Sequence, residues 1–349
     1  MMRTESKLFR RSFYYLFSAI AIAFTATDCA SNSADSKDAG NAPDTDTKDA
    51  DPGDSTDNDT DTMTDLPSTD TEGDPCNGMP SLCEKRFDEV IYLTTHAAMA
   101  YDSPPFMKTH QEKSIRTQLD EGIRGLWLEL HSMDGNSSLC LDDCSLGQLA
   151  LNIALSDVVD YLDVNPRQVV SILLTSKIQT KALIAEIQDS VIAPWLGSLK
   201  DLPSLPTLEE IIQSEKRLFL FVDVATSVDD PDAGVDGGLE QVPPWLHFFQ
   251  EHLWATRDDF TSVNEMNCNP PGGSSEASLY IVNHFLAPGQ MDAGTTDVKS
   301  RAELVNQTPF LENRLQNCAK QHDQKPSFVV VDFFNKDVIT AVNAVNLLQ

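Results

Sequence analysis

Short apolar runs rich in Val, Ile, Leu and Phe recur along the chain from position 90 onward. Runs of this length and composition are typical of buried parallel strands, which lack the strict alternation of a half-exposed strand. The sequence therefore predicts strands over residues 90–96, 122–131, 169–176, 217–224, 278–285 and 327–334.

Helical patterns lie between these runs. One apolar pattern at helical spacing stops before Asn165-Pro166, because proline cannot continue a helix. Thr207 and Glu210 form a capping box, which marks the start of another helix. The predicted helices cover residues 149–162, the segment after Thr207, 302–318 and 338–348.

Strands that alternate with helices indicate the α/β class, either as a parallel barrel or as a doubly wound sheet. The doubly wound nucleotide-binding fold is less favoured, since no strand is followed by a glycine-rich phosphate loop or a GxGxxG motif. In a parallel barrel, catalytic side chains lie at the strand ends. The polar residues at or near predicted strand ends are His96, Glu129, His131, Asn283, His284 and Asp332.

The first residues are typical of an export signal. Basic side chains precede a mostly apolar run over 12–27, which is short for a bilayer span of about 20 residues. Residues 26–30, Ala-Thr-Asp-Cys-Ala, resemble a bacterial lipoprotein cleavage box, although Asp28 departs from that pattern. We expect 1–29 to be a signal peptide with Cys29 as the lipidated residue of an extracytoplasmic, membrane-anchored lipoprotein. The alternatives are ordinary cleavage with loss of Cys29, or an uncleaved anchor.

An acidic segment follows the signal. Residues 31–74 hold 14 acidic and 2 basic residues and almost no large apolar side chains. Such a segment cannot offset its ordering entropy by burial, so we expect residues 30–75 to be a disordered, self-repelling linker. A calcium site there is disfavoured, because the acidic residues lack the fixed spacing and turn glycine of a calcium loop. The barrel domain is expected over 76–349.

The charge of the remaining chain limits its partners. Residues 75–349 carry 38 acidic and 19 basic residues, a net charge of −19. Nucleic-acid binding needs a basic surface and is excluded on this ground. Docking to anionic lipid is disfavoured for the same reason, which leaves the lipid anchor as the expected membrane contact.

Six cysteines remain when Cys29 is set aside. An even number in an exported chain indicates three disulfides, and six cysteines allow 15 connectivities. Local spacing favours Cys76 with Cys83 and Cys140 with Cys144, which leaves Cys268 with Cys318. A metal site is the rival interpretation, but no CxxC pair or histidine cluster supports it.

Several short motifs occur in a fixed order between Cys76 and Phe333. They are Cys76-Asn77-Gly78 with Cys83, Leu93-Thr94-Thr95-His96, Gln111, Gln118-Leu119 before Gly122-Ile123-Arg124, Leu139-Cys140 with Cys144, Asn165-Pro166 with Val169-Val170, and the runs 281–285 and 328–333. In this order and spacing they resemble the phosphatidylinositol-specific phospholipase C X-domain family, above all its secreted, cysteine-containing members.

The resemblance implies a distorted parallel (β/α) barrel of the TIM type and a phosphoric diester hydrolase of lipid metabolism. Its substrate would be a phosphoinositide or a related glycerophosphodiester. In the family one histidine is the general base, a second protonates the leaving oxygen, and an arginine or a calcium ion stabilises the phosphate charge. His96 matches the first histidine, Asp332 the aspartate that orients it, and Arg124 an arginine that is either catalytic or part of a structural salt bridge.

One departure from the family pattern concerns catalysis directly. Leu141 stands in place of the second histidine, and leucine cannot donate a proton. His131 lies two residues beyond Glu129 on the same face and is a candidate replacement for the acid. Otherwise, we expect weak or lost activity. The alternative function is that of a catalytically inactive surface lipoprotein that binds a phospho-ligand, a lipid or a protein partner.

Further departures concern calcium. Ala97 replaces an asparagine ligand, and Trp127 and Thr175 replace acidic residues. Glu129 matches a ligand aspartate and is the expected metal-binding residue, helped at most by the aspartates at 142–143. This set is incomplete for Ca²⁺, which takes six to eight oxygen ligands. No other cofactor is expected.

Overall fold

The computed structural model describes residues 74–102, 106–200, 204–224, 242–271, 277–288 and 297–348. The predicted signal peptide, Cys29 and nearly all of the acidic linker lie outside these residues. Within the described part, no helix has both the length and the apolar character needed to cross a membrane.

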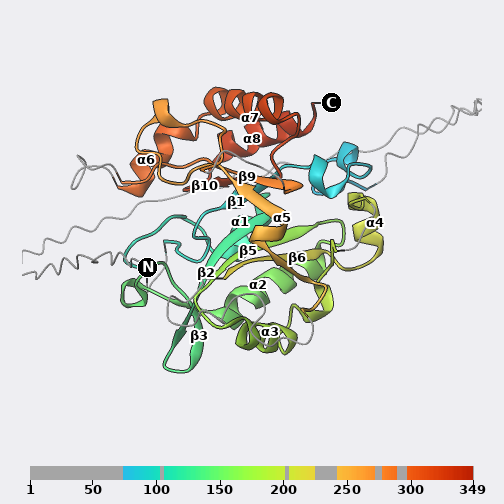
Figure 1. Cartoon of the computed structure of the whole chain (residues 1–349), viewed down its shortest axis with the longest axis vertical. Coiled ribbons are helices and arrows are strands. Elements are labelled where there is room, and N and C mark those ends of the chain that lie inside the picture. Colours follow the sequence, from blue (N-terminus) through green and yellow to red (C-terminus); the bar gives the residue numbers. More distant parts are fainter. Residues whose placement is uncertain are drawn as a thin grey trace, which may run out of the picture. The chain divides into compact units, whose positions relative to one another are not determined.

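Eight parallel strands form a nearly closed barrel (Figure 1). In spatial order they are β7 (Leu246–Phe248), β6 (Leu218–Val224), β5 (Val170–Ser176), β2 (Gly125–Met133), β1 (Tyr92–Thr95), β10 (Phe328–Val331), β9 (Leu279–Asn283) and β8 (Leu253–Ala255). The strands follow each other in chain order around the barrel, and hydrogen bonding is interrupted between β7 and β8. A doubly wound sheet would reverse direction part-way, so the barrel expectation is confirmed.

The remaining strands extend one side of the barrel. β2 continues past the barrel and pairs antiparallel with β3 (Asn136–Leu139), which in turn pairs with β4 (Leu149–Ala150). All six predicted strands are present. β7 and β8 were missed because each has only three residues, which is too short for a hydrophobic period to show.

The helices lie between successive strands, except for α8, which follows β10. They are α1 (Ile115–Asp120), α2 (Leu151–Val164), α3 (Thr180–Gln188), α4 (Leu208–Gln213), α5 (Phe249–His252), α6 (Val298–Val305), α7 (Thr308–His322) and α8 (Lys336–Asn346). The capping box at Thr207 and Glu210 is confirmed. The single helix predicted over 302–318 is wrong: α6 ends before Asn306, and Pro309 lies in the first turn of α7, where its missing N–H costs nothing.

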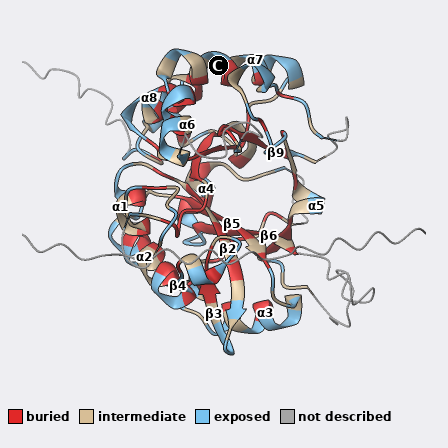
Figure 2. Cartoon of the chain, turned by 90° about the vertical axis from the view of Figure 1, so that its left-hand side faces the viewer, coloured by how far each residue is buried: buried red, intermediate tan, exposed pale blue. Residues whose placement is uncertain are grey.

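Aromatic side chains fill the barrel interior. The Phe87 ring lies 4.7 Å from that of Tyr92 and 4.8 Å from that of Phe219, and Phe221 and Phe328 are 5.5 Å apart, all measured between ring centroids. A second apolar layer separates the strands from the helices, and Figure 2 shows the buried residues concentrated on the strands. The rigid barrel holds the strand ends, and the residues that follow them, in fixed relative positions.

Three disulfides join the cysteines of the described domain. The pairs are Cys76–Cys83, Cys140–Cys144 and Cys268–Cys318, as local spacing favoured. Disulfides of this number are typical of proteins in an oxidising, extracellular compartment.

Cys268–Cys318 should contribute most to stability, because it closes a loop of 50 residues whereas Cys76–Cys83 closes one of 7. On the chain-entropy relation, the double variant Cys268→Ser/Cys318→Ser should lose about 4 kcal/mol of unfolding free energy, and Cys76→Ser/Cys83→Ser about 2 kcal/mol. Urea unfolding of both variants measures the difference. Equal losses, or a larger loss for the short loop, would contradict the prediction.

Candidate functional site

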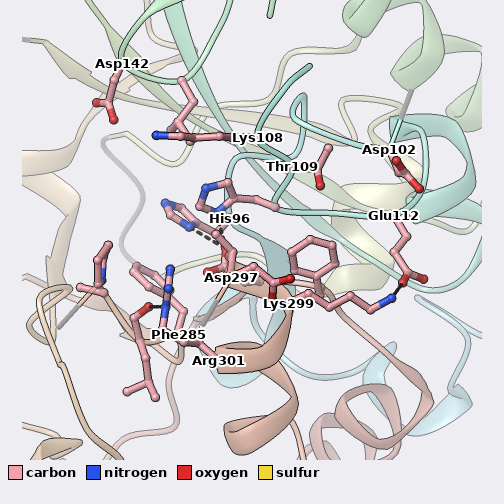
Figure 3. Close-up of a pocket in the computed structure, with 18 of the residues that line it drawn as sticks. His96, Asp102, Lys108, Thr109, Glu112, Asp142, Phe285, Asp297, Lys299 and Arg301 are labelled. Carbon is pink, nitrogen blue, oxygen red and sulfur yellow. Dashed lines mark hydrogen bonds and ion pairs between the residues drawn. The ribbon is translucent and has the colours of Figure 1, made fainter. Parts of the chain in front are cut away.

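A cavity of about 810 Å³ opens at the carboxyl ends of the barrel strands. His96 follows β1 directly and Asp332 follows β10, so the two strands, which are neighbours, bring both side chains to its floor. Leu141 and Asp142 line the same cavity. Figure 3 shows His96 between Lys108 and Asp142 on one side and Phe285 and Arg301 on the other. The position of the family's second histidine therefore faces the cavity, and Leu141 does not close it.

One carboxylate oxygen contacts two imidazoles at this floor. Asp332 Oδ1 lies 2.8 Å from His96 Nδ1 and 2.8 Å from His110 Nδ1. Burial alone would raise the pKa of Asp332, but the charge of His96 and the hydrogen bonds of both histidines outweigh it and bring that pKa to about 2. An ionised carboxylate only accepts hydrogen bonds. Both Nδ1 atoms therefore carry a hydrogen, and each N–H donates a hydrogen bond to Asp332. Each Nε2 is then the proton-exchanging atom of its ring.

His96 is held in one orientation by its neighbours. Its ring stacks on Phe285, with centroids 4.3 Å apart and an angle of 3° between the planes. The rings of His110 and Trp127 meet it edge-on at 5.0 and 6.2 Å. The His96 side chain is 23% exposed, which leaves it open to the cavity. A fixed ring with a defined tautomer is a preorganised proton acceptor.

The segment that carries His110 is anchored by hydrogen bonds of the backbone and of one buried amide. The His110 N–H donates to Ala100 O at 2.8 Å, and its carbonyl accepts from the Phe333 N–H at 2.7 Å. The buried amide of Gln111 donates to His96 O at 2.9 Å and to Val331 O at 3.0 Å. These bonds connect the segment to the residues after β1 and β10.

The backbone turns sharply immediately after each of the two strand-end residues. Ala97 has φ 45° and Phe333 has φ 42°, both in the left-handed region. Residues other than glycine, asparagine and aspartate rarely adopt this backbone conformation. Each such residue destabilises the folded chain by about 1–3 kcal/mol. Their placement directly after His96 and Asp332 is typical of strain kept at a functional site.

The cavity contains both signs of charge. Among its described lining residues the cations are Lys108, Lys299 and Arg301. Lys299 forms an ion pair with Glu112, and Arg301 Nε donates to Leu286 O at 2.9 Å. These cations come from the segments that follow β1 and β9. They are the described groups that can meet a phosphate in the cavity.

Arg124 is not among the residues that line this cavity, which favours the structural interpretation of that residue. It precedes β2 at the opposite end of the strand from the site. Its guanidinium donates to Gln168 Oε1 at 2.8 Å and to the carbonyls of Leu119 and Ile123, and it stacks on Tyr161. Burial lowers the pKa of Arg124, and these acceptors offset its desolvation. The residue joins α1, β2 and α2.

The residues at the family's calcium positions form hydrogen bonds with other side chains of the protein. The Trp127 indole N–H donates to Thr175 Oγ1 at 3.1 Å, so two acidic positions are replaced by a donor and a hydroxyl bonded to each other. Glu129 lines the cavity, but its Oε1 accepts from His131 Nε2 at 2.7 Å and lies 3.8 Å from Lys177 Nζ. Glu129 as a metal ligand stays a prediction, and its neighbours here supply few of the six to eight oxygens that Ca²⁺ takes.

His131 is bonded to Glu129 and is not among the residues that line the cavity. The structure therefore does not support it as the replacement acid. Two other polar strand-end residues are buried and structural. Asn283 donates to Thr256 O, and His284 is held between Val305 O at 3.0 Å and Arg314 Nη1 at 3.0 Å.

The profile of the PI-PLC X 1 family matches residues 82–346. The chain belongs to the PI-PLC X family. A secreted protein of Arthroderma benhamiae is 29% identical over 276 residues, which cover 72% of this chain and 58% of the relative. A PI-PLC X domain-containing protein of the same fungus is 27% identical over 289 residues, covering 76% and 88%. An Arabidopsis thaliana protein of that description is 24% identical, covering 71% and 58%.

Solved phospholipases share the fold of this PI-PLC X chain. Phosphatidylinositol-specific phospholipase C from Listeria monocytogenes superposes with a TM-score of 0.54 at 15% identity, covering 76% of this chain and 96% of that enzyme. The enzyme from Staphylococcus aureus gives 0.51 at 14% identity, covering 76% and 95%. The barrel is thus that of phospholipase C-like phosphodiesterases.

Sequence reasoning missed His110 in this PI-PLC X chain. The residue lies outside every periodic segment, on the irregular connection between β1 and α1. Its one sequence signal is its position next to Gln111, which belongs to the family-like motifs. Only the fold shows that Gln111 bonds to both strand ends and so brings His110 to Asp332.

The buried histidines make stability depend on pH. Burial, together with the charge of Arg314, lowers the pKa of His284 to about 3. The unfolded chain takes up that proton below about pH 6.5, so stability is complete above this pH and is lost as the pH falls. Between pH 6.5 and 5, His284→Gln should lose stability less steeply than the wild type, by up to about 1.4 kcal/mol per pH unit.

Chemical unfolding at several pH values measures these slopes. His247 provides a second case, since burial lowers its pKa to about 4, and His247→Gln should change the slope in the same direction. If both variants keep the wild-type slope, these imidazoles are not held neutral in the folded protein.

Proposed function

We propose that this protein is a phospholipase C-like phosphoric diester hydrolase in which His96 is the general base. The observation that carries the proposal is the His96–Asp332 hydrogen bond of 2.8 Å at the floor of an open cavity. Asp332 is 3% exposed, so its charge acts on the imidazole in a poorly solvated environment. The family membership and the phospholipase fold support the same activity.

The chemistry starts at His96 Nε2. With Nδ1–H donated to Asp332, Nε2 accepts the proton of the attacking hydroxyl as that oxygen bonds to phosphorus. Asp332 stabilises the imidazolium that forms, as a carboxylate does in other histidine pairs. Lys108 and Arg301 are the cavity cations proposed to bind the phosphoryl oxygens, where negative charge develops.

The proposed substrate is a phosphoinositide or a related glycerophosphodiester. Such a molecule carries its own nucleophile, a ring or glycerol hydroxyl on the carbon beside the phosphate ester. The cavity therefore needs to supply only a base, a cation and an acid. The cavity volume of about 810 Å³ is sufficient for a headgroup of this size.

Binding without turnover is the second candidate function, and Leu141 is the observation that favours it. The residue lines the cavity at the family's acid position and can neither donate a proton nor bind phosphate. In this case the protein would hold a phospho-ligand, a lipid or a protein partner on the His96 side of the cavity.

An activated ester separates the two functions. The p-nitrophenyl phosphodiester of inositol has a leaving group that departs without protonation, so the wild type should release p-nitrophenolate even if its acid is weak. His96→Ala should lower kcat/KM by about 10²- to 10⁴-fold, the usual contribution of one general base or acid. Spectrophotometric rates measure the effect, and His322→Asn, outside the cavity, is the matched histidine control.

Equal rates for the wild type and His96→Ala would show that His96 is not the base. Calorimetric binding of inositol phosphate without cleavage of the ester would favour the binding function instead.

We also propose that the protein acts outside the cytoplasm, anchored through Cys29. The disulfides support export, and the cysteine after the apolar run supports lipidation. Cys29→Ser should move the protein from the membrane fraction to the soluble fraction, and the intact mass of the wild type should include a lipid. A variant that still sediments with membranes, together with a wild-type mass without lipid, would exclude this anchor.

A further inference from the structure

Two features of His110 go beyond a structural role. Its imidazole lines the cavity together with Leu141, while its Nδ1 is bonded to the same carboxylate oxygen as the general base. Its side chain is 13% exposed, so the ring is largely enclosed but reaches the cavity. A histidine that only anchored its segment would not need the cavity, because Gln111 and the backbone of residue 110 already supply that anchorage.

The relative placement of the two rings suits proton transfer at two points. The centroids of His96 and His110 are 5.0 Å apart and the ring planes are perpendicular. Both Nδ1 atoms converge on Asp332 Oδ1, so the two Nε2 atoms lie on the far sides of their rings from that oxygen. An in-line displacement at phosphorus needs a base at the attacking oxygen and an acid at the leaving oxygen.

We propose that His110 is the general acid that protonates the leaving oxygen, in place of the histidine that Leu141 replaces. The inference rests on the proposed hydrolase function and adds a second catalytic residue to it. The hydrogen bonds to Asp332 Oδ1 hold both rings with Nδ1 toward the carboxylate, so Nε2 is the atom of each ring that can exchange a proton with the substrate. One buried carboxylate thus serves both histidines.

The proton balance closes without another reactant. His96 Nε2 takes the proton of the attacking hydroxyl while the new O–P bond forms. The bond between phosphorus and the leaving oxygen breaks, and His110 Nε2 gives its proton to that oxygen. His96 ends as the imidazolium and His110 as the neutral ring. When water opens the cyclic phosphodiester in the reverse sense, the two histidines exchange roles and their starting protonation is restored.

The variant His110→Asn tests this role while keeping a hydrogen bond from residue 110 to Asp332. An asparagine amide can still donate to Asp332 from this position, but it cannot transfer a proton. With phosphatidylinositol, whose leaving group is an alkoxide, His110→Asn should lower kcat/KM by about 10²- to 10⁴-fold. With the p-nitrophenyl ester, which needs no acid, the loss should be less than about tenfold. An unchanged melting temperature confirms that the variant is folded.

A rescue variant uses the cavity position of Leu141. In the His110→Asn background, Leu141→His should recover cleavage of phosphatidylinositol, because it places an imidazole at another point of the same cavity wall. His131→Asn is the rival variant, since His131 is also bonded to a carboxylate near the barrel mouth.

The outcomes separate this inference from the proposed function. Wild-type cleavage of neither ester would overturn the hydrolase function and this inference with it. Cleavage with equal losses on both esters in His110→Asn would overturn the acid role alone, as would a selective loss in His131→Asn. Loss of wild-type activity in EDTA that added Zn²⁺ restores would also overturn it, because the convergent His96, His110 and Asp332 atoms, all within 4.8 Å of one another, would then be metal ligands.

Discussion

The candidate site depends on a single buried carboxylate with two imidazole partners. Asp332 is almost completely removed from water, and an unpaired charge there would be strongly unfavourable. The hydrogen bonds from His96 and His110 keep it ionised and, in return, determine which nitrogen of each ring carries the proton. The orientation and tautomer of both histidines therefore follow from their hydrogen bonds to one carboxylate at the end of β10.

The barrel makes this interaction possible at low cost. β1 and β10 are paired through four consecutive residues, so the positions that follow them are adjacent before any side chain interacts. The left-handed residues Ala97 and Phe333 then end each strand abruptly and turn the chain away. Their unfavourable backbone conformations are held by the surrounding hydrogen bonds, including that from Phe333 N–H to His110 O. The strain and the pairing of the functional groups lie in the same few residues.

The features that could be predicted from the sequence are those that lie on, or at the ends of, buried strands. Strands such as 169–176 were predictable because burial on both faces leaves an uninterrupted apolar run. His96 and Asp332 were predictable because they end such runs. His110 was not, since it lies on an irregular segment whose path depends on the buried amide of Gln111. The role of Arg124 was open because salt-bridge and catalytic arginines share one motif, and only its carbonyl partners distinguish them.

Leu141 has a different meaning in this setting. In sequence it removes the acid from a site that needs two proton-transfer groups. In the fold it is an apolar wall of a cavity in which a second imidazole already contacts Asp332. A histidine at 141 would place a third imidazole in a cavity that already contains charged side chains. A leucine at this position has no polar group to desolvate. Asp332 then has two imidazole partners and accepts a hydrogen bond from each. The leucine at 141 is therefore compatible with the proposed acid role of His110, whose ring approaches from the segment between β1 and α1.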